Sequence, residues 1–78
     1  GVIIFSREQF GQRLYEMRKK NHETQADLAT LLECVKSHIS EMESGKKITT
    51  AEKIVLICEH YHISSDYLLG LSDDPSPR

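Results

Sequence analysis

The chain has 78 residues, of which 38% are hydrophobic and 28% are charged, a composition typical of one small folded domain rather than a disordered chain. Its longest apolar runs, Val2–Phe5 and Ile54–Cys58, are far too short to cross a bilayer, which excludes a membrane-spanning segment within these residues. The net charge of −2 gives no overall basic surface, so a nucleic-acid partner would require a local basic rim.

Residues 1–5 are predicted to form an apolar N-terminal arm. Phe5 would pack on the first helix as a hydrophobic staple, or the arm would pair with a second protomer. Ser6 and Gln9 have the spacing of a capping box at a helix start. Apolar residues then recur at helical intervals, at Phe10, Leu14 and Met17. The pattern predicts a first helix over residues 7–20, which ends in a basic run that suits the helix dipole.

Two shorter helices are predicted next. Thr24 is suited to cap the second helix, with Asp27 at its third position. The third helix is predicted from residue 35 or 36 to residue 43, and Gly45 would end it. The inward-facing residues of the pair are Leu28, Ala29, Leu31, Leu32, Ile39 and Met42. Two short helices joined by a tight turn, with a polar start to the second, have the layout of a helix-turn-helix.

Two more helices follow. Thr49 or Thr50 would open the fourth helix, and its inner face comprises Ile54, Ile57, Cys58 and Tyr61. Ser64 would cap a short fifth helix that Gly70 ends. Residues 72–78 hold both prolines and no apolar side chain, so they are predicted to form a flexible tail or linker. We therefore expect an all-α fold of five short helices, with the folded domain at residues 6–71.

Four motifs follow one another along the chain: Arg13-Leu-x-x-Met-Arg18, Thr24-Gln-x-x-Leu-Ala29, Ile39-Ser-x-Met-Glu-x-Gly-Lys46 and Ser64-x-Asp-Tyr-Leu-Leu-Gly70. In this order and spacing they resemble the helix-turn-helix family of lambda-type repressors, Cro proteins and XRE regulators. The resemblance implies a lambda-repressor-like fold with the helix-turn-helix in the second and third helices. It also implies sequence-specific binding of double-stranded DNA by a prokaryotic or phage transcriptional regulator, with a repressor as the expected kind.

The same resemblance implies roles for three groups of residues. Base contacts from the third helix are expected from Lys36, Ser37, Ser40 and Glu41. Phosphate contacts are expected from Thr24, Gln25, Ser44, Lys46 and Lys47. Arg18 and Glu43 resemble a structural ion pair that joins the first helix to the end of the third. Because lysine can donate to guanine and glutamate can accept from cytosine, Lys36 and Glu41 would favour a G·C-containing half-site.

Two positions depart from the pattern of the family. Glu33 stands where the turn commonly has glycine, and Val35 stands where a serine or threonine commonly caps the third helix. A non-glycine residue at positive φ costs about 1 kcal/mol, so the turn either changes its geometry or accepts that strain. Glu33 and Glu41 also bring two negative charges near the expected DNA face.

The resemblance further implies a homodimer, because one recognition helix reads only a few base pairs. Two recognition helices about 34 Å apart would read a pseudo-palindromic operator. The dimer surface is expected on the fourth and fifth helices, with Ile63, Leu69 and Leu71. The alternative function is a protein-interaction module of the same fold, such as an antitoxin or an anti-repressor partner, because an acidic recognition helix suits a basic protein.

Other chemistry is not indicated by the sequence. Two cysteines could form one bridge at most, so we expect reduced thiols in a cytoplasmic protein. Cys58, His60 and His62 fit no tetrahedral zinc spacing, because His60 would point away from the other two. The chain also lacks a glycine-rich phosphate loop and a nucleophile elbow. We expect no metal, no cofactor and no enzymatic activity.

Overall fold

The structure, a computed structural model, describes residues 4–77, which form five helices and no strand within that range. The helices are α1 (Arg7–Lys20), α2 (Gln25–Leu31), α3 (Lys36–Glu43), α4 (Ala51–Tyr61) and α5 (Ser65–Leu69). The predicted all-α fold of five short helices is confirmed. The predicted arm at residues 1–5 lies largely outside the described residues. Among those residues, every helix falls short of the length and apolar character that a membrane crossing needs.

Local sequence determines where four of the helices begin. The first N–H groups of a helix have no partner within it, and a side-chain oxygen at the N-cap can accept from one of them. The capping residues are Ser6, Thr24, Thr50 and Ser64, and each accepts from the backbone N–H three residues further on. α3 differs, since its N-cap Val35 makes no side-chain hydrogen bond. Its start therefore depends on tertiary packing.

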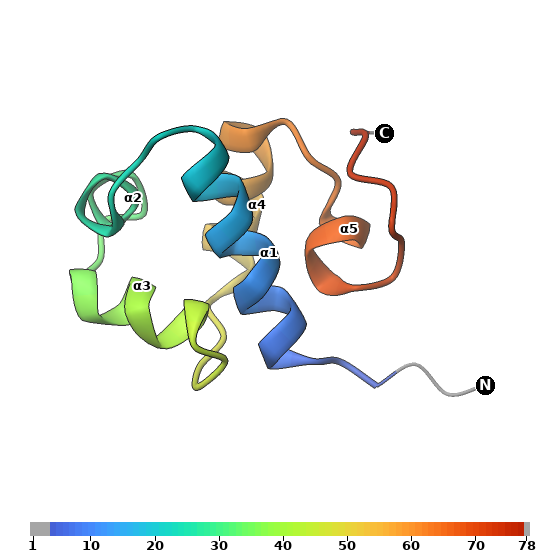
Figure 1. Ribbon diagram of the computed structural model, residues 1–78, viewed down its shortest axis with the longest axis horizontal. Helices are drawn as coiled ribbons and strands as arrows, with labels where there is room; N and C mark the ends of the chain where they lie inside the picture. The colour runs from blue at the N-terminus through green and yellow to red at the C-terminus, as the bar shows by residue number, and fades with distance from the viewer. Residues whose placement is uncertain (1–3, 78) are drawn as a thin grey trace.

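α1 is the helix against which both ends of the molecule pack. It contacts α3 on one side and α5 on the other, while α2 packs on α3 and α4 on α5. Figure 1 shows α2 and α3 together at one end, α5 at the opposite end and α4 behind α1. The fully buried side chains come from every helix: Phe10, Leu14, Leu28, Leu32, Ile39, Met42, Ile57 and Leu68. One core thus fixes the positions of α2 and α3.

The segment before α1 packs on that helix. The Phe5 ring lies 6.2 Å from the Phe10 ring, between centroids. Phe5 precedes the N-cap Ser6, and Phe10 is the fourth residue of α1, so the pair occupies the positions of a hydrophobic staple. Pairing of the arm with a second protomer stays a prediction.

The segment after α5 folds back against α1. Arg13 donates to the Ser72 carbonyl oxygen at 2.9 Å and pairs with Asp73 at 2.8 Å. The Ser64 N–H donates to the Pro75 carbonyl oxygen at 3.1 Å. These contacts place the segment beside α1 and the start of α5. Its predicted flexibility is a property of its dynamics and stays a prediction.

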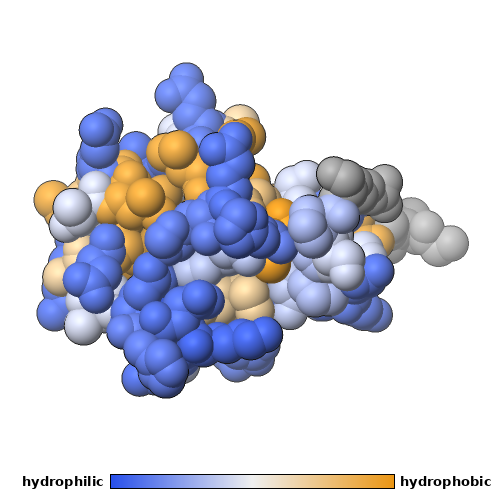
Figure 2. Space-filling view, turned by 90° about the horizontal axis from the view of Figure 1, so that it is seen from above, coloured by the Kyte–Doolittle hydropathy of each residue, from blue (hydrophilic) through white to orange (hydrophobic). Residues whose placement is uncertain are grey.

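One residue expected on a dimer surface lies in the core instead. Ile63 is only 6% exposed and belongs to the hydrophobic core cluster. Exposed apolar side chains in this part of the molecule are Val55 and Leu56 on α4 and Leu71 after α5. The expectation for Ile63 is therefore wrong. In the view from above in Figure 2, exposed apolar side chains gather toward the end of the molecule that holds α2.

Candidate nucleic-acid interface

The turn between α2 and α3 contains a residue in a left-handed conformation. The Glu33 N–H donates to the Thr30 carbonyl at 3.3 Å, and the Cys34 N–H donates to the Ala29 carbonyl at 3.0 Å. Glu33 has a φ of 54°, a conformation for which glycine is the usual residue. Of the two outcomes expected for this turn, the chain accepts the strain, about 1 kcal/mol, and keeps the tight geometry.

α3 presents a polar face opposite its buried face. Ile39 and Met42 are fully buried against the core. Four residues form the accessible face: Lys36, Ser37 and Ser40 are exposed, and Glu41 is half-buried. With about 3.6 residues per turn, positions 36, 37, 40 and 41 lie on one side of the helix. The structure thus brings together the four residues predicted to contact bases.

Gly11 allows α1 to approach the end of α3 closely. A Cβ atom at this position would lie 2.3 Å from the Met42 carbonyl oxygen and 2.7 Å from the Glu43 carbonyl oxygen. Only a residue without a side chain fits there. No sequence-based prediction included Gly11, although a glycine inside a helix, which costs about 0.5–1 kcal/mol relative to alanine, was a signal of close packing. Gly11 sets the distance between α1 and the C-terminal end of α3.

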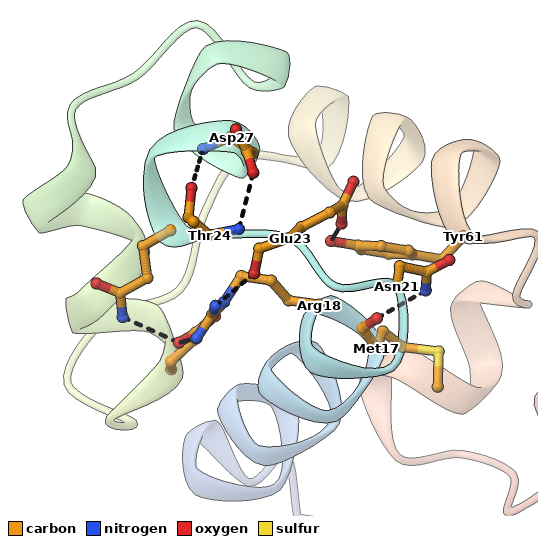
Figure 3. Close-up of polar contacts among 9 residues, drawn as sticks. Met17, Arg18, Asn21, Glu23, Thr24, Asp27 and Tyr61 are labelled. Atoms are coloured by element: carbon orange, nitrogen blue, oxygen red, sulfur yellow. Dashed lines mark hydrogen bonds and ion pairs between the residues drawn. The ribbon is translucent and has the colours of Figure 1, made fainter.

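Arg18 and Glu43 form a bidentate ion pair between α1 and α3. Arg18 Nε lies 2.6 Å from Glu43 Oε2, and Nη2 lies 3.0 Å from Oε1. The two side chains are 9% and 8% exposed. Arg18 Nη1 also donates to the Glu23 carbonyl oxygen at 2.8 Å, as Figure 3 shows. The hydrogen bond to Glu43 raises the pKa of Arg18, against the opposing effect of burial, so the guanidinium stays charged.

Gln25 is tied to the same carboxylate. Its Nε2 donates to Glu43 Oε1 at 3.0 Å, and the side chain is half-buried. A primary amide carries two N–H donors, and this bond engages one of them. Thr24, the neighbouring residue predicted to contact phosphate, is exposed and closes the capping box of α2 with Asp27. Glu43 therefore orients Gln25 at the rim of the α3 face.

The loop after α3 is folded back onto the helix. The N–H groups of Lys46 and Lys47 donate to the Glu41 carbonyl oxygen at 2.9 and 3.3 Å, and the Ser44 hydroxyl donates to the same oxygen at 3.1 Å. Gly45 has a φ of 81° and ends α3, as the sequence predicted. The three residues predicted to contact phosphate here are exposed, and they lie beside the accessible face of α3.

Arg7 adds a cation to this rim, although no sequence-based prediction included it. Its Nη1 lies 3.4 Å from the Lys46 carbonyl oxygen, across 39 residues of sequence, and its side chain is exposed. Only the packing of the start of α1 against the loop brings the two together. The basic rim thus contains Arg7, Lys46 and Lys47.

A second polar cluster joins the α1–α2 loop to α4. Glu23 Oε1 accepts from the Tyr61 hydroxyl at 2.6 Å, and Glu23 Oε2 lies 2.6 Å from His60 Nε2. Burial, followed by the hydrogen bond to Glu23, raises the pKa of Tyr61 above its ordinary range. These side chains are more than 35 residues apart in sequence, so no local pattern could pair them. Figure 3 shows the Tyr61 hydroxyl facing the Glu23 carboxylate.

Metal ligands do not gather in the described part of the chain. Residues 4–77 contain no group of three or more His, Cys, Asp or Glu side chains placed to hold a metal ion. Both cysteines are free and half-buried, and burial raises the pKa of Cys58.

Residues 11–73 match the family of helix-turn-helix domains. Over 67 residues, the chain is 37% identical to YobD, an uncharacterised HTH-type transcriptional regulator of Bacillus subtilis. This similarity covers 86% of the chain and 60% of that regulator. The chain thus spans about 60% of the length of the curated relative that it matches.

Solved structures with the same architecture include regulators of several kinds. The restriction-modification controller protein C.AhdI of Aeromonas hydrophila has a TM-score of 0.70 at 27% identity, over 80% of this chain and 94% of that one. The P22 c2 repressor, crystallised with a synthetic operator, has a TM-score of 0.72 at 28% identity, over 77% and 91%. The clp gene regulator ClgR of Corynebacterium glutamicum has a TM-score of 0.69 at 27% identity, over 81% and 82%.

Proposed function

The chain belongs to the family of helix-turn-helix domains, and we propose that it is the DNA-binding domain of a cytoplasmic transcriptional regulator that places α3 in the major groove. The observation that carries the proposal is the accessible polar face of α3, held at a fixed position by α1 and α2. An α-helix fits the major groove, where each base pair presents a distinct pattern of donors and acceptors. The proposed activity is binding rather than catalysis.

Two sets of residues contact different parts of the DNA, one the bases and the other the phosphates. Lys36, Ser37, Ser40 and Glu41 read base edges from the face of α3. Thr24, Gln25, Ser44, Lys46 and Lys47 contact phosphates at its two rims. Phosphate contacts fix register and orientation, whereas base contacts carry sequence information. The tie between Gln25 and Glu43 supports the assignment of Gln25, since it aims the amide at the rim of the groove-facing surface.

The regulator acts as a homodimer on a pseudo-palindromic operator and represses transcription. Support for the dimer comes from the exposed apolar side chains of Val55 and Leu56 on α4 and of Leu71 after α5. Contiguous exposed apolar patches mark protein–protein interfaces, and a patch formed by these side chains would be covered in the dimer. A sedimentation measurement with and without operator DNA tests this, and a monomer under both conditions would contradict the dimer.

Selection from a randomised double-stranded DNA library at two salt concentrations tests the binding function. We expect enrichment of a two-fold-symmetric motif that is lost steeply as salt rises, because each phosphate contact releases counterions. Gln25→Ala should lower the affinity for all DNA sequences alike. Lys36→Ala should reduce the binding free energy on the enriched site by about 1–3 kcal/mol and relax the sequence specificity of the domain. No enrichment at either salt concentration would contradict DNA binding.

A second function is favoured by one observation, the acidic residues Glu33 and Glu41 at the α3 face together with the net charge of −2. Such a surface suits a basic protein, and the domain would then be a protein-interaction module such as an antitoxin. The same selection separates the two functions, because a protein-interaction module would enrich no DNA motif.

A further inference from the structure

Glu41 and Lys47 form an ion pair between two groups to which the proposed function gives different tasks. Lys47 Nζ lies 3.3 Å from Glu41 Oε2, and the side chains are 61% and 34% exposed. Glu41 lies on the base-reading face of α3, while Lys47 belongs to the basic rim beside it. An exposed ion pair adds little to the stability of a fold. We therefore expect the Glu41–Lys47 pair to affect the binding of a partner rather than the stability of the fold.

The backbone couples the two residues as well. The Lys47 N–H and the Lys46 N–H both donate to the Glu41 carbonyl oxygen. The loop that carries the lysines is thus anchored on the residue whose side chain pairs with one of them. In the proposed complex, a turn of Lys47 toward a phosphate would leave the Glu41 carboxylate without its cation in a groove lined by negative charge.

We propose that the Glu41–Lys47 pair makes Glu41 the residue by which the domain discriminates between DNA sites. Glu41 then disfavours every site that offers its carboxylate no hydrogen-bond donor. The inference rests on the proposed function and deepens it. At a site with a cytosine N4 amino group opposite residue 41, the carboxylate exchanges Lys47 for that donor. At any other site the carboxylate stays unpaired beside the phosphates, and the loss of the ion pair is not compensated.

The charges around this pair agree with the proposal. Lys36 lies on the same face of α3, and Arg7 and Lys46 lie on the rim beyond it. A face with these cations and without Glu41 would attract any duplex through its phosphates. Glu41 is the acidic residue of this face that contacts a rim lysine, so its carboxylate controls whether the rim binds without regard to sequence.

The test compares Glu41→Gln with the wild-type chain on the duplex enriched in the selection and on a scrambled duplex of equal length. Glutamine keeps the size of the side chain and removes its charge. We expect tighter binding of the scrambled duplex and unchanged or weaker binding of the enriched duplex. The ratio of the two affinities should fall by about 5- to 150-fold, the range that one base contact contributes to discrimination.

Glu33→Gln is the matched control. It also removes one negative charge, at the α2–α3 turn, but Glu33 forms no ion pair with Lys47 in the structure. It should strengthen binding of both duplexes by the same factor and leave their ratio unchanged. Salt dependence gives a second readout. With Glu41→Gln, the slope of log affinity against log salt on scrambled DNA should steepen by about one unit, since removal of the carboxylate gives the DNA-facing surface one more net positive charge.

The double variant Glu41→Gln/Lys47→Gln completes a cycle. Lys47→Gln should lower the affinity for the scrambled duplex more strongly in the Glu41→Gln background than in the wild-type background. Such a difference would show that the two residues are coupled. Two outcomes would overturn this inference alone. One is an equal effect of Lys47→Gln in both backgrounds, and the other is a change of the affinities for both duplexes by the same factor in Glu41→Gln. A wild-type chain that enriches no motif would overturn the proposed function together with it. Circular dichroism confirms that each variant is folded.

Discussion

Two arginines on α1 hold the two ends of the molecule, and they do so with different partners. Arg18 pairs with Glu43 at the α2–α3 end, where both side chains are buried. Arg13 donates to the Tyr67 and Ser72 carbonyl oxygens at the α5 end, lies over the Tyr67 ring, and pairs with the 98% exposed Asp73. Arg18 has one backbone acceptor, the Glu23 carbonyl oxygen, and its counter-charge is a single buried carboxylate. Arg13 has several acceptors, most of them backbone, and its counter-charge is exposed. The end proposed to read DNA is therefore the one that depends on a buried counter-charge.

The largest effect that this comparison predicts is for Glu43→Ala. Removal of the carboxylate leaves Arg18 buried without a counter-charge, and we expect a loss of about 3–5 kcal/mol in the free energy of unfolding. Urea denaturation measures it. The double variant Arg18→Met/Glu43→Leu replaces both charges with apolar groups and should lose less than Glu43→Ala alone. A loss below about 1 kcal/mol for Glu43→Ala would mean that the pair behaves like an exposed one.

A smaller loss is expected for Gly11→Ala, on the same side of α1. The new methyl group would collide with the Met42 and Glu43 carbonyl oxygens and push α3 away. We expect about 1–3 kcal/mol of destabilisation, although alanine is otherwise the better helix former. Gln12→Ala at the exposed neighbouring position is the control and should change stability by less than about 0.5 kcal/mol. Thermal unfolding of both variants measures the difference.

At the α5 end, Asp73→Ala should have a weak effect. Arg13 keeps its contacts with the Tyr67 and Ser72 carbonyl oxygens and with the Tyr67 ring, so the exposed carboxylate is one partner among several. We expect a loss below about 1 kcal/mol in the free energy of unfolding. A loss as large as that of Glu43→Ala would remove the contrast between the two ends.

The smallest effect concerns pH and two exposed carboxylates, one at each end. Backbone hydrogen bonds from Thr24 and Ser76 lower the pKa values of Asp27 and Asp74 below their ordinary value of 3.8. A lowered pKa in the folded state means that each carboxylate stabilises the fold above its ordinary pKa. This stabilisation is lost as the pH falls through the lowered value.

Variants assign that acid sensitivity to one end of the molecule. Asp27→Asn should reduce the loss of stability between about pH 5 and about pH 2, because Asp27 closes the capping box of α2. Asp74→Asn should change it less, since its turn supports no helix. Urea denaturation across this pH range compares the two variants. A larger effect for Asp74→Asn would show that the tail, not α2, is the acid-sensitive part.

The fold followed from local signals in the sequence. Side chains such as Thr24 and Ser64 cap the helix that follows them, and residues such as Ile39 and Met42 repeat at helical spacing, so starts and inner faces could be predicted from neighbours in the chain. Gly45 ended α3 for an equally local reason, its positive φ.

Contacts between distant parts of the chain could not be predicted in this way. Arg7 reaches the Lys46 carbonyl, and Glu23 reaches Tyr61, across 39 and 38 residues. The burial of Ile63 depends on how α4 and α5 meet, which no periodicity encodes. The roles of the residues on the α3 face came from family resemblance, and their contacts with DNA stay predictions.

The bond between Gln25 and Glu43 has a consequence for the thermodynamics of binding. A free glutamine side chain loses rotational freedom when a partner immobilises it, at about 0.5–1.5 kcal/mol of unfavourable entropy. In this chain the amide is already held 3.0 Å from Glu43 before any partner arrives. Its rotamer entropy is thus lost during folding, so the proposed contact of Gln25 with a phosphate would add enthalpy to complex formation without a matching entropic cost.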